Sequence, residues 1–189
     1  RPLVFLKPPS SLIASGDCVV YPKISRRVDF EGELGVVIGT RARSISPDDA
    51  AAHILGYTCV NDVTARDVQK GEGQWTRGKG FDTFCPIGPF LATPDEIPDI
   101  DHLTVWQKHN GVLLQKGHTA DMMFNIPFLI EYISQGMTLL PGDVVSTGTP
   151  SGIGSAREPQ VLMTTGDVVE IGVNGLGEQR SPVMAMGKS

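Results

Sequence analysis

Three carboxylates in one predicted strand are the residues whose spacing first suggests chemistry. The stretch 28–39, VDFEGELGVVIG, alternates in polarity, so a strand would place Asp29, Glu31 and Glu33 on one face and apolar residues such as Phe30 on the other. Glu31 and Glu33 would then sit about 7 Å apart along the strand, at about 3.3 Å rise per residue. Side chains at that spacing can converge on one metal ion, although a solvent-exposed outer face of a half-buried strand explains the same pattern.

Asp62 adds a further acidic side chain near the end of a β-rich run, 57–63, where functional side chains are often presented. Residues 64–69, TARDVQ, then predict a turn of helix. Residues 70–80 predict a polar loop with four glycines, which either let the backbone approach a ligand closely or simply make a flexible surface loop. Lys79, near the end of this loop, favours the ligand-binding interpretation.

Extended segments and one short helix are expected around the acidic strand. Prolines interrupt residues 3–21, so this part is predicted to be extended rather than helical. A helix is predicted from Ser46, which suits the N-cap position, to Leu55, with Pro47 in its first turn.

Two β-hairpins are expected in the second half of the chain. Asn-Gly pairs divide the segments 103–116 and 168–183, and Asn-Gly fits the tight turn of a hairpin. An amphipathic helix is predicted at 126–135, and a strand at 143–147 that leads into a GTPSGIG loop. That loop lacks the spacing of a phosphate-binding loop, so its backbone N–H groups suit a small carboxylate instead.

The composition limits the class of protein. The chain has 189 residues, 40% of them hydrophobic, which predicts a single domain over residues 1–189 with one core. A net charge of −5 and the lack of a basic block argue against a nucleic-acid partner. The apolar runs are too short for a membrane span and nothing resembles a signal peptide, so no membrane partner is expected. Three widely spaced cysteines without a Cys-x-x-Cys pair predict free thiols in a reducing cytoplasm.

Taken together, these motifs resemble the fumarylacetoacetate hydrolase superfamily. The matching pieces, in the order the family has them, are DFEGEL at 29–34, NDVTARDVQ at 61–69, QWTRGKGFDTFCPIGPF at 74–90 and STGTPSGIG at 146–154. They look most like the branch that contains acylpyruvate hydrolases, fumarylpyruvate hydrolases and the isomerase/decarboxylase of homoprotocatechuate breakdown. The resemblance implies a mainly β (α+β) fold with a few short helices around the family's rolled mixed β-sheet, and a homodimer.

The resemblance also implies a metal site. It makes Glu31, Glu33 and Asp62 ligands of a Mg²⁺ or Mn²⁺ ion, which agrees with the strand-face argument. Hard carboxylate oxygens suit such an ion, whereas zinc is disfavoured without histidine or cysteine.

Further site residues follow from the same resemblance. Lys79 matches the family's active-site lysine, placed to stabilise negative charge or to protonate a departing carbon. Arg66 is expected to orient its neighbours in the catalytic site. Gln69, Gly148 and Thr149 are expected at the substrate, with Thr149 holding a substrate carboxylate.

The activity implied is metal-dependent hydrolysis of a carbon–carbon bond in an acylpyruvate or related β-diketo acid, a small 2-oxo acid of aromatic or 2-oxo acid catabolism. Isomerisation or decarboxylation of a 2-oxo or 2-hydroxy-dienoic diacid, including oxaloacetate, on the same metal site is the alternative. A metal-bearing binding module without turnover is a third.

The base for the attacking water is expected outside the sequence shown. Relatives carry a His-x-x-Glu pair on a lid upstream of the FLKP segment, and this chain opens at Arg1, beside that segment. We therefore expect such a lid before Arg1, and its presence would favour hydrolysis. Among the histidines, only His118 is expected near the site, as part of a pocket wall.

Overall fold

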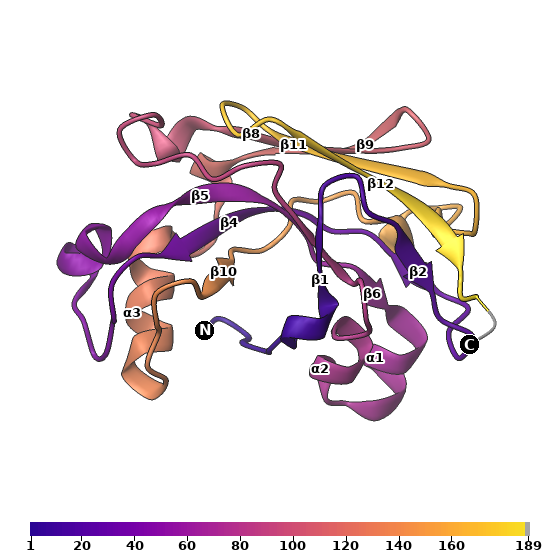
Figure 1. Cartoon of the computed structure of the whole chain (residues 1–189), viewed down its shortest axis with the longest axis horizontal. Helices are drawn as coiled ribbons and strands as arrows, with labels where there is room; N and C mark the ends of the chain where they lie inside the picture. Colours follow the sequence, from indigo (N-terminus) through magenta and orange to yellow (C-terminus); the bar gives the residue numbers. More distant parts are fainter. Residues whose placement is uncertain (188–189) are drawn as a thin grey trace.

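The computed structural model describes residues 1–187 as two stacked β-sheets with helices below them (Figure 1). The first sheet has five strands, in the order β1 (Leu12–Ala14), β7 (Cys85–Ile87), β5 (Ile54–Asn61), β4 (Gly32–Ile38) and β10 (Val144–Ser146). The second also has five, in the order β2 (Val19–Tyr21), β12 (Glu178–Ala185), β11 (Val168–Val173), β8 (Thr104–His109) and β9 (Val112–His118). A separate two-stranded ribbon pairs β3 (Val28–Asp29) with β6 (Thr64–Ala65).

Helices lie on the side of the first sheet that faces away from the second. In Figure 1, α3 (Ile126–Gly136) lies below one end of that sheet, and α1 (Arg66–Glu72) and α2 (Trp75–Lys79) lie below the other. The N-terminal segment passes between these two groups of helices. The short 3₁₀ helices are η1 (Pro9–Ser11), η2 (Pro47–His53), η3 (Ile100–His102), η4 (Thr119–Asp121) and η5 (Gly154–Ala156). The predicted mainly β fold with a few short helices is confirmed.

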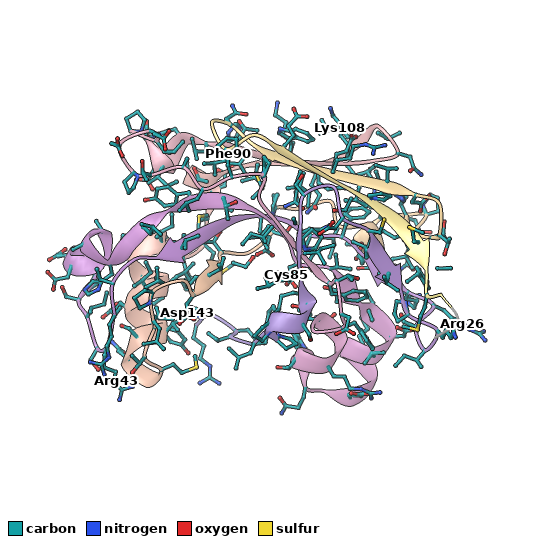
Figure 2. The ribbon with its side chains drawn as sticks, viewed as in Figure 1. Arg26, Arg43, Cys85, Phe90, Lys108 and Asp143 are labelled. Atoms are coloured by element: carbon teal, nitrogen blue, oxygen red, sulfur yellow. The ribbon has the colours of Figure 1, made fainter. Side chains whose placement is uncertain are left out.

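Side chains fill the space between the two sheets, as Figure 2 shows. One buried apolar cluster includes Val36 of β4, Cys59 of β5, and Ile171 and Val173 of β11. Nearly every residue of β4 is buried, whichever face it lies on. A polar side chain on this strand is therefore enclosed by protein, and its charge must be balanced by protein groups or a bound ion rather than by water.

The acidic stretch forms two strands rather than the single strand predicted. β3 pairs with β6, whereas β4 pairs with β5, and the chain breaks between them at Phe30 and Glu31. Asp29 causes the break, because its Oδ1 accepts the N–H of Phe30 (3.0 Å) and that of the distant Gly154 (2.9 Å). The solvent-exposed alternative is wrong, since Glu31 and Glu33 are only 7% and 3% exposed.

The short helix predicted from Ser46 to Leu55 is the 3₁₀ helix η2, which ends at His53, two residues earlier than predicted. The Ser46 hydroxyl donates to Asp49 (2.8 Å) instead of capping a backbone N–H. Ile54 already pairs with Ile38 across the sheet, so the ladder between β4 and β5 ends the helical segment before it completes an α-helix.

The prediction of a polar loop at 70–80 is also wrong, because most of this segment is helical. α1 continues to Glu72, and α2 follows after a short turn. A Cβ atom on Gly78 would lie 2.8 Å from the backbone nitrogen of Gln69, so glycine is needed where the two helices touch. This contact fixes the position of Lys79 at the end of α2.

The hairpins and the helix predicted for the second half are confirmed. β8 pairs with β9, and β11 with β12, as antiparallel hairpins, although residues 174–177 form a four-residue connection in the second hairpin rather than a tight Asn-Gly turn. Asn110 and Gly111 both have positive φ (51° and 78°), as a type I′ turn requires. Asn125 caps α3 by accepting the N–H of Phe128 (3.0 Å). In residues 1–187, no helix is both long and apolar enough to cross a membrane.

Candidate metal centre

Glu31, Glu33 and Asp62 form one buried acidic cluster. The antiparallel register sets Gly32 of β4 opposite Asn61 of β5, so Asp62 emerges beside the start of β4. There its N–H donates to the carbonyl of Glu31 (2.9 Å). Each of the three side chains offers a carboxylate oxygen within 4.8 Å of the other two. One metal ion can bridge oxygens at that spacing.

Buried cations neutralise two of the three carboxylates. Lys79 Nζ donates to Glu31 Oε2 (2.8 Å) and to Asp62 Oδ2. Lys7 Nζ donates to Asp62 Oδ1 (2.6 Å), and Arg66 Nη2 donates to Glu31 Oε1 (2.5 Å). Burial raises the pKa of Asp62, but Lys7 and Lys79 outweigh burial and hold that pKa below its ordinary value.

Glu33 differs, because within residues 1–187 no cation forms an ion pair with it. Its Oε2 accepts the backbone N–H of Gly148 (3.0 Å) and the hydroxyl of Ser146. Burial, with the charges of Asp62 and Glu31 close by, raises the pKa of Glu33 to about 8. Without a cation beside it, the Glu33 carboxyl group is thus largely protonated at neutral pH, and a divalent cation is the kind of group that would stabilise its charged form.

The donor set fits a hard cation such as Mg²⁺ or Mn²⁺, because the cluster offers carboxylate oxygens and no histidine or cysteine. Cys85 of β7, labelled near the centre of Figure 2, is buried in this region. Burial raises the pKa of its thiol to about 11, so the thiol stays protonated and is a poor metal ligand and nucleophile. All three cysteines are free thiols, as predicted.

Arg66 links the acidic cluster to Asp29. Its Nε donates to Asp29 Oδ2 (2.8 Å), and its Nη1 donates to Gln69 Oε1 (3.3 Å). Asp29 also accepts the backbone N–H groups of Gly154 (2.9 Å) and Ser155 (3.0 Å). The sequence predicted Asp29 on the same strand face as Glu31 and Glu33. In the structure, Asp29 binds Arg66 and the GTPSGIG loop and does not join the acidic cluster.

Gly148 and Thr149 lie between the acidic cluster and a separate cavity. Both line a cavity of about 460 Å³, whose walls also include Leu34 and His118. Because side chains alternate along β4, Leu34 points away from Glu33, so this cavity lies on the opposite face of the strand from the carboxylates. His118 therefore lines a cavity, as expected, but Glu31, Glu33 and Asp62 do not line that cavity.

Residues 1–184 match the family described as fumarylacetoacetate (FAA) hydrolase C-terminal. This chain belongs to that family. A 2,4-didehydro-3-deoxy-L-rhamnonate hydrolase from Sphingomonas sp. is 48% identical to it over 185 residues, which are 97% of this chain and 65% of the relative. The chain thus spans about two thirds of the length of its first curated relatives.

Solved structures of fumarylacetoacetate hydrolase family members share the fold. The fumarylacetoacetate hydrolase from psychrophilic Exiguobacterium antarcticum has a TM-score of 0.95 at 39% identity, over 98% of this chain and 67% of that chain. The 2-hydroxyhepta-2,4-diene-1,7-dioate isomerase from Mycobacterium marinum has a TM-score of 0.92 at 41% identity, over 100% of this chain and 71% of that chain. The relatives are hydrolases and isomerases, so the family resemblance is confirmed and the family is one of enzymes.

Lys7 is a member of this site that the sequence argument missed. Besides Asp62, its Nζ donates to the backbone carbonyls of Val63 (3.3 Å) and Lys79. Its side chain is only 11% exposed. The one local signal in the sequence is that Lys7 is the single charged residue of the apolar, proline-bounded segment VFLKPP.

Replacing Lys7 with Met should destabilise the metal-free protein by about 1–3 kcal/mol, because Asp62 and two backbone carbonyls lose a buried donor. Saturating Mg²⁺ should recover much of this loss if the acidic cluster binds the ion, because the ion would supply positive charge beside Asp62 and would bind only the folded state. Urea unfolding with and without Mg²⁺ measures both effects.

The matched control for this substitution is Arg77→Met. Arg77 pairs with Glu72 at the surface, where the two side chains are 60% and 37% exposed, and such pairs contribute at most about 1 kcal/mol. Equal losses of stability in the two variants would contradict a structural role for Lys7 in the site.

Proposed function

We propose that this chain is a divalent-metal-dependent hydrolase that cleaves a carbon–carbon bond in an acylpyruvate or a related β-diketo acid. The observation that carries the proposal is the buried cluster of Glu31, Glu33 and Asp62, with Lys79 bonded to two of its members. A small 2-oxo acid fits such a site, because its carboxylate and 2-oxygen are hard, adjacent donors.

Glu31, Glu33 and Asp62 would hold the Mg²⁺ or Mn²⁺ ion. Each of these residues offers one carboxylate oxygen, and a hard cation held by three of them would still accept oxygen atoms of water or substrate. When bound, the ion would polarise the 2-oxo group and stabilise the negative charge that develops as the carbon–carbon bond breaks.

Lys79 provides a second positive centre. Burial lowers the pKa of Lys79, but Asp62 and Glu31 outweigh burial and raise it, so Nζ stays protonated. Its Nζ lies 4.8 Å from the centroid of the Phe5 ring, which shields that side of the ammonium from water. A protonated amine in this position can stabilise developing negative charge or give its proton to the departing carbon.

The remaining predicted residues have narrower roles. Arg66 acts through Glu31, whose carboxylate it orients. The amide nitrogen of Gln69 makes no hydrogen bond to other described residues, so it can donate to a substrate oxygen. The Gly148 N–H is committed to Glu33, so we assign the contact with a substrate carboxylate to the N–H of the next residue, Thr149.

One named relative supports a β-diketo substrate. The name of the Sphingomonas enzyme, 2,4-didehydro-3-deoxy-L-rhamnonate hydrolase, describes an acid with oxo groups at positions 2 and 4. Hydrolysis between those two carbonyl groups would release pyruvate, the three-carbon 2-oxo acid, in the form of its enolate. An acidic metal site with a protonated lysine beside it suits the charge of that product.

Isomerisation or decarboxylation of a 2-oxo or 2-hydroxy-dienoic diacid is the second candidate, supported by the isomerase relatives. Hydrolysis needs a base for the attacking water, and none of the four histidines belongs to the acidic cluster.

A substrate screen on the full-length polypeptide tests these candidates. Acylpyruvates, oxaloacetate and unsaturated 2-hydroxy diacids would be offered after EDTA treatment and again after Mg²⁺ or Mn²⁺ is added back. We expect acylpyruvate hydrolysis that EDTA abolishes and metal restores. Activity that EDTA does not affect would remove the metal from the proposal, isomerisation or decarboxylation alone would favour the second candidate, and metal binding without any turnover would indicate a binding module.

A further inference from the structure

Gln115 of β9 closes a ring of hydrogen bonds next to the acidic cluster. It is fully enclosed, with 1% of its surface exposed. Its Oε1 accepts the backbone N–H of Gly32 (3.1 Å), and its Nε2 donates to Thr149 Oγ1 (2.8 Å). The Thr149 hydroxyl in turn donates to the carbonyl of Gly32 (2.9 Å). Both polar atoms of the Gly32 residue are thus held, one by Gln115 and one by Thr149.

We propose that Gln115 is a positioning residue for the metal-binding carboxylates, an inference that rests on the metal site proposed above. Gly32 is the residue between Glu31 and Glu33, so the orientation of its peptide groups sets the directions in which both carboxylates leave the chain. Gln115 fixes that orientation from the second sheet, across the interface between the sheets.

The same side chain also fixes the loop that bonds Glu33. Gln115 Nε2 donates to the carbonyl of Pro150 (2.8 Å) as well as to Thr149. Gly148, which precedes them in the loop, donates its N–H to Glu33 (3.0 Å). Gln115 therefore ties together the two segments whose relative position determines where the Glu33 carboxylate lies.

Only an amide of this length can make all of these contacts. Gly32 N–H requires an acceptor and the Pro150 carbonyl requires a donor, so the two ends of the Gln115 amide are not interchangeable. A glutamate would lose the donor, and a methionine would lose both functions.

The ring changes the role expected of Thr149. A hydroxyl has one proton, and that of Thr149 is directed at the Gly32 carbonyl. The side chain therefore has no proton left for a substrate carboxylate, and it serves the loop and strand instead. Thr149 and Gln115 act as one positioning unit.

Gln107 provides a matched control within the same layer of the structure. It lies directly opposite Gln115 in the β8–β9 register and is also fully buried, at 0% exposed. Yet neither its Nε2 nor its Oε1 has a hydrogen-bond partner among the described residues. Replacing Gln107 with Met makes the same change of side chain and removes the same amide without breaking a hydrogen bond.

The experiment compares Gln115→Met, Gln107→Met, Thr149→Val and Thr149→Ser in the full-length protein. Isothermal titration with Mn²⁺ gives metal affinity, thermal unfolding gives stability, and steady-state kinetics separate kcat from KM. We expect Gln115→Met and Thr149→Val each to weaken Mn²⁺ binding by about 10–100-fold, the usual effect of removing a group that orients a metal ligand. Gln107→Met and Thr149→Ser should bind Mn²⁺ as the wild type does.

Coupling between the two residues is the second readout. Because they belong to one ring, the double variant Gln115→Met/Thr149→Val should bind Mn²⁺ no more weakly than the worse single variant. If the losses of Mn²⁺ affinity in the two single variants multiply in the double variant, the two residues act independently, and the proposal that they form one positioning unit is wrong.

Several results would overturn the proposal. A folded Gln115→Met protein with lower thermal stability but wild-type Mn²⁺ affinity would make Gln115 an ordinary packing residue. A Thr149→Val protein with raised KM and unchanged Mn²⁺ affinity would assign the hydroxyl to the substrate. If Gln115→Met does not fold, the Thr149→Val and Thr149→Ser pair decides alone. If the wild-type protein binds no divalent ion, the proposed metal site itself is refuted. The Mn²⁺ titration of the wild type shows this outcome directly, before any variant is compared.

Discussion

Replacing Glu33 with Gln should weaken divalent-metal binding by more than about 100-fold, because loss of a ligand costs more than loss of a group that orients one, which typically costs about 10–100-fold. Glu33 is the most informative member of the acidic cluster to change. Glu31 and Asp62 also form ion pairs with Lys79. Replacing either of them therefore removes a metal ligand and also removes a partner of the buried Lys79 ammonium group. Glu33 forms no ion pair within residues 1–187, so its replacement changes the ligand alone.

The same variant has a second expected result, in the opposite direction. Without metal, Glu33→Gln should be as stable as the wild type or more stable, since a neutral amide replaces a buried carboxyl group crowded by the charges of Asp62 and Glu31. Weaker metal binding together with undiminished metal-free stability would show that Glu33 contributes to metal binding and not to the stability of the fold.

Calorimetric titration with Mg²⁺ and thermal unfolding in EDTA measure the two effects. Glu158→Gln, a change of the same kind at an exposed position, is the matched control and should alter neither. Wild-type metal affinity in Glu33→Gln would exclude Glu33 as a ligand. A clear loss of metal-free stability would contradict the charge argument.

Part of the acidic cluster could be predicted because its signals are local. Glu31 and Glu33 are two residues apart, which is the period of a strand. Asp62, which follows the strand that pairs with β4, was assigned to the cluster through the family resemblance. The Asn110-Gly111 turn was predictable for the same reason, since a two-residue turn depends on its own backbone angles. Patterns of this kind need no knowledge of the rest of the chain.

The residues that the sequence did not reveal act over long distances along the chain. Lys7 is 55 residues from Asp62, and Gln115 is 83 residues from Gly32. The break in the acidic strand has a similar origin, because Gly154, which bonds Asp29, is 125 residues away. Such contacts exist only once the sheets have packed, and no local period encodes them.

The helical 70–80 segment is an instructive intermediate case. Its glycines were recognised as marking close backbone contacts, and at Gly78 this is what the structure contains. The partner is the backbone of α1 rather than a ligand. Glycine content alone does not distinguish the two, because both need the absence of a Cβ atom.

Replacing Lys79 with Met should lower kcat by about 100-fold or more, the effect expected when a charged group that stabilises a transition state is removed from a desolvated site. Methionine keeps the length and most of the volume of the lysine stem, so α2 and its contact with α1 should persist. The loss should fall on kcat more than on KM, because the charge of the reacting group is greatest in the transition state.

Metal binding distinguishes this effect from damage to the site. Lys79 Nζ donates hydrogen bonds to Glu31 and Asp62. Without the lysine, the positive charge that partly balances these two carboxylates is lost, so their affinity for a metal ion should not fall. Metal-free stability should fall, because both carboxylates lose a buried partner, and Mg²⁺ should restore part of it. Lys70→Met, at an exposed position on α1, is the matched control and should change none of these quantities.

Steady-state kinetics on the best substrate of the screen, together with Mg²⁺ titration of the same preparations, decide the role of Lys79. A folded Lys79→Met protein that binds Mg²⁺ and turns over at the wild-type rate would reduce Lys79 to a counter-ion of the acidic cluster. Loss of Mg²⁺ binding in parallel with kcat would show that the lysine shapes the metal site, and the protonation step would then need a different donor. Only loss of kcat with metal binding retained supports the catalytic ammonium, since only that role separates chemistry from binding.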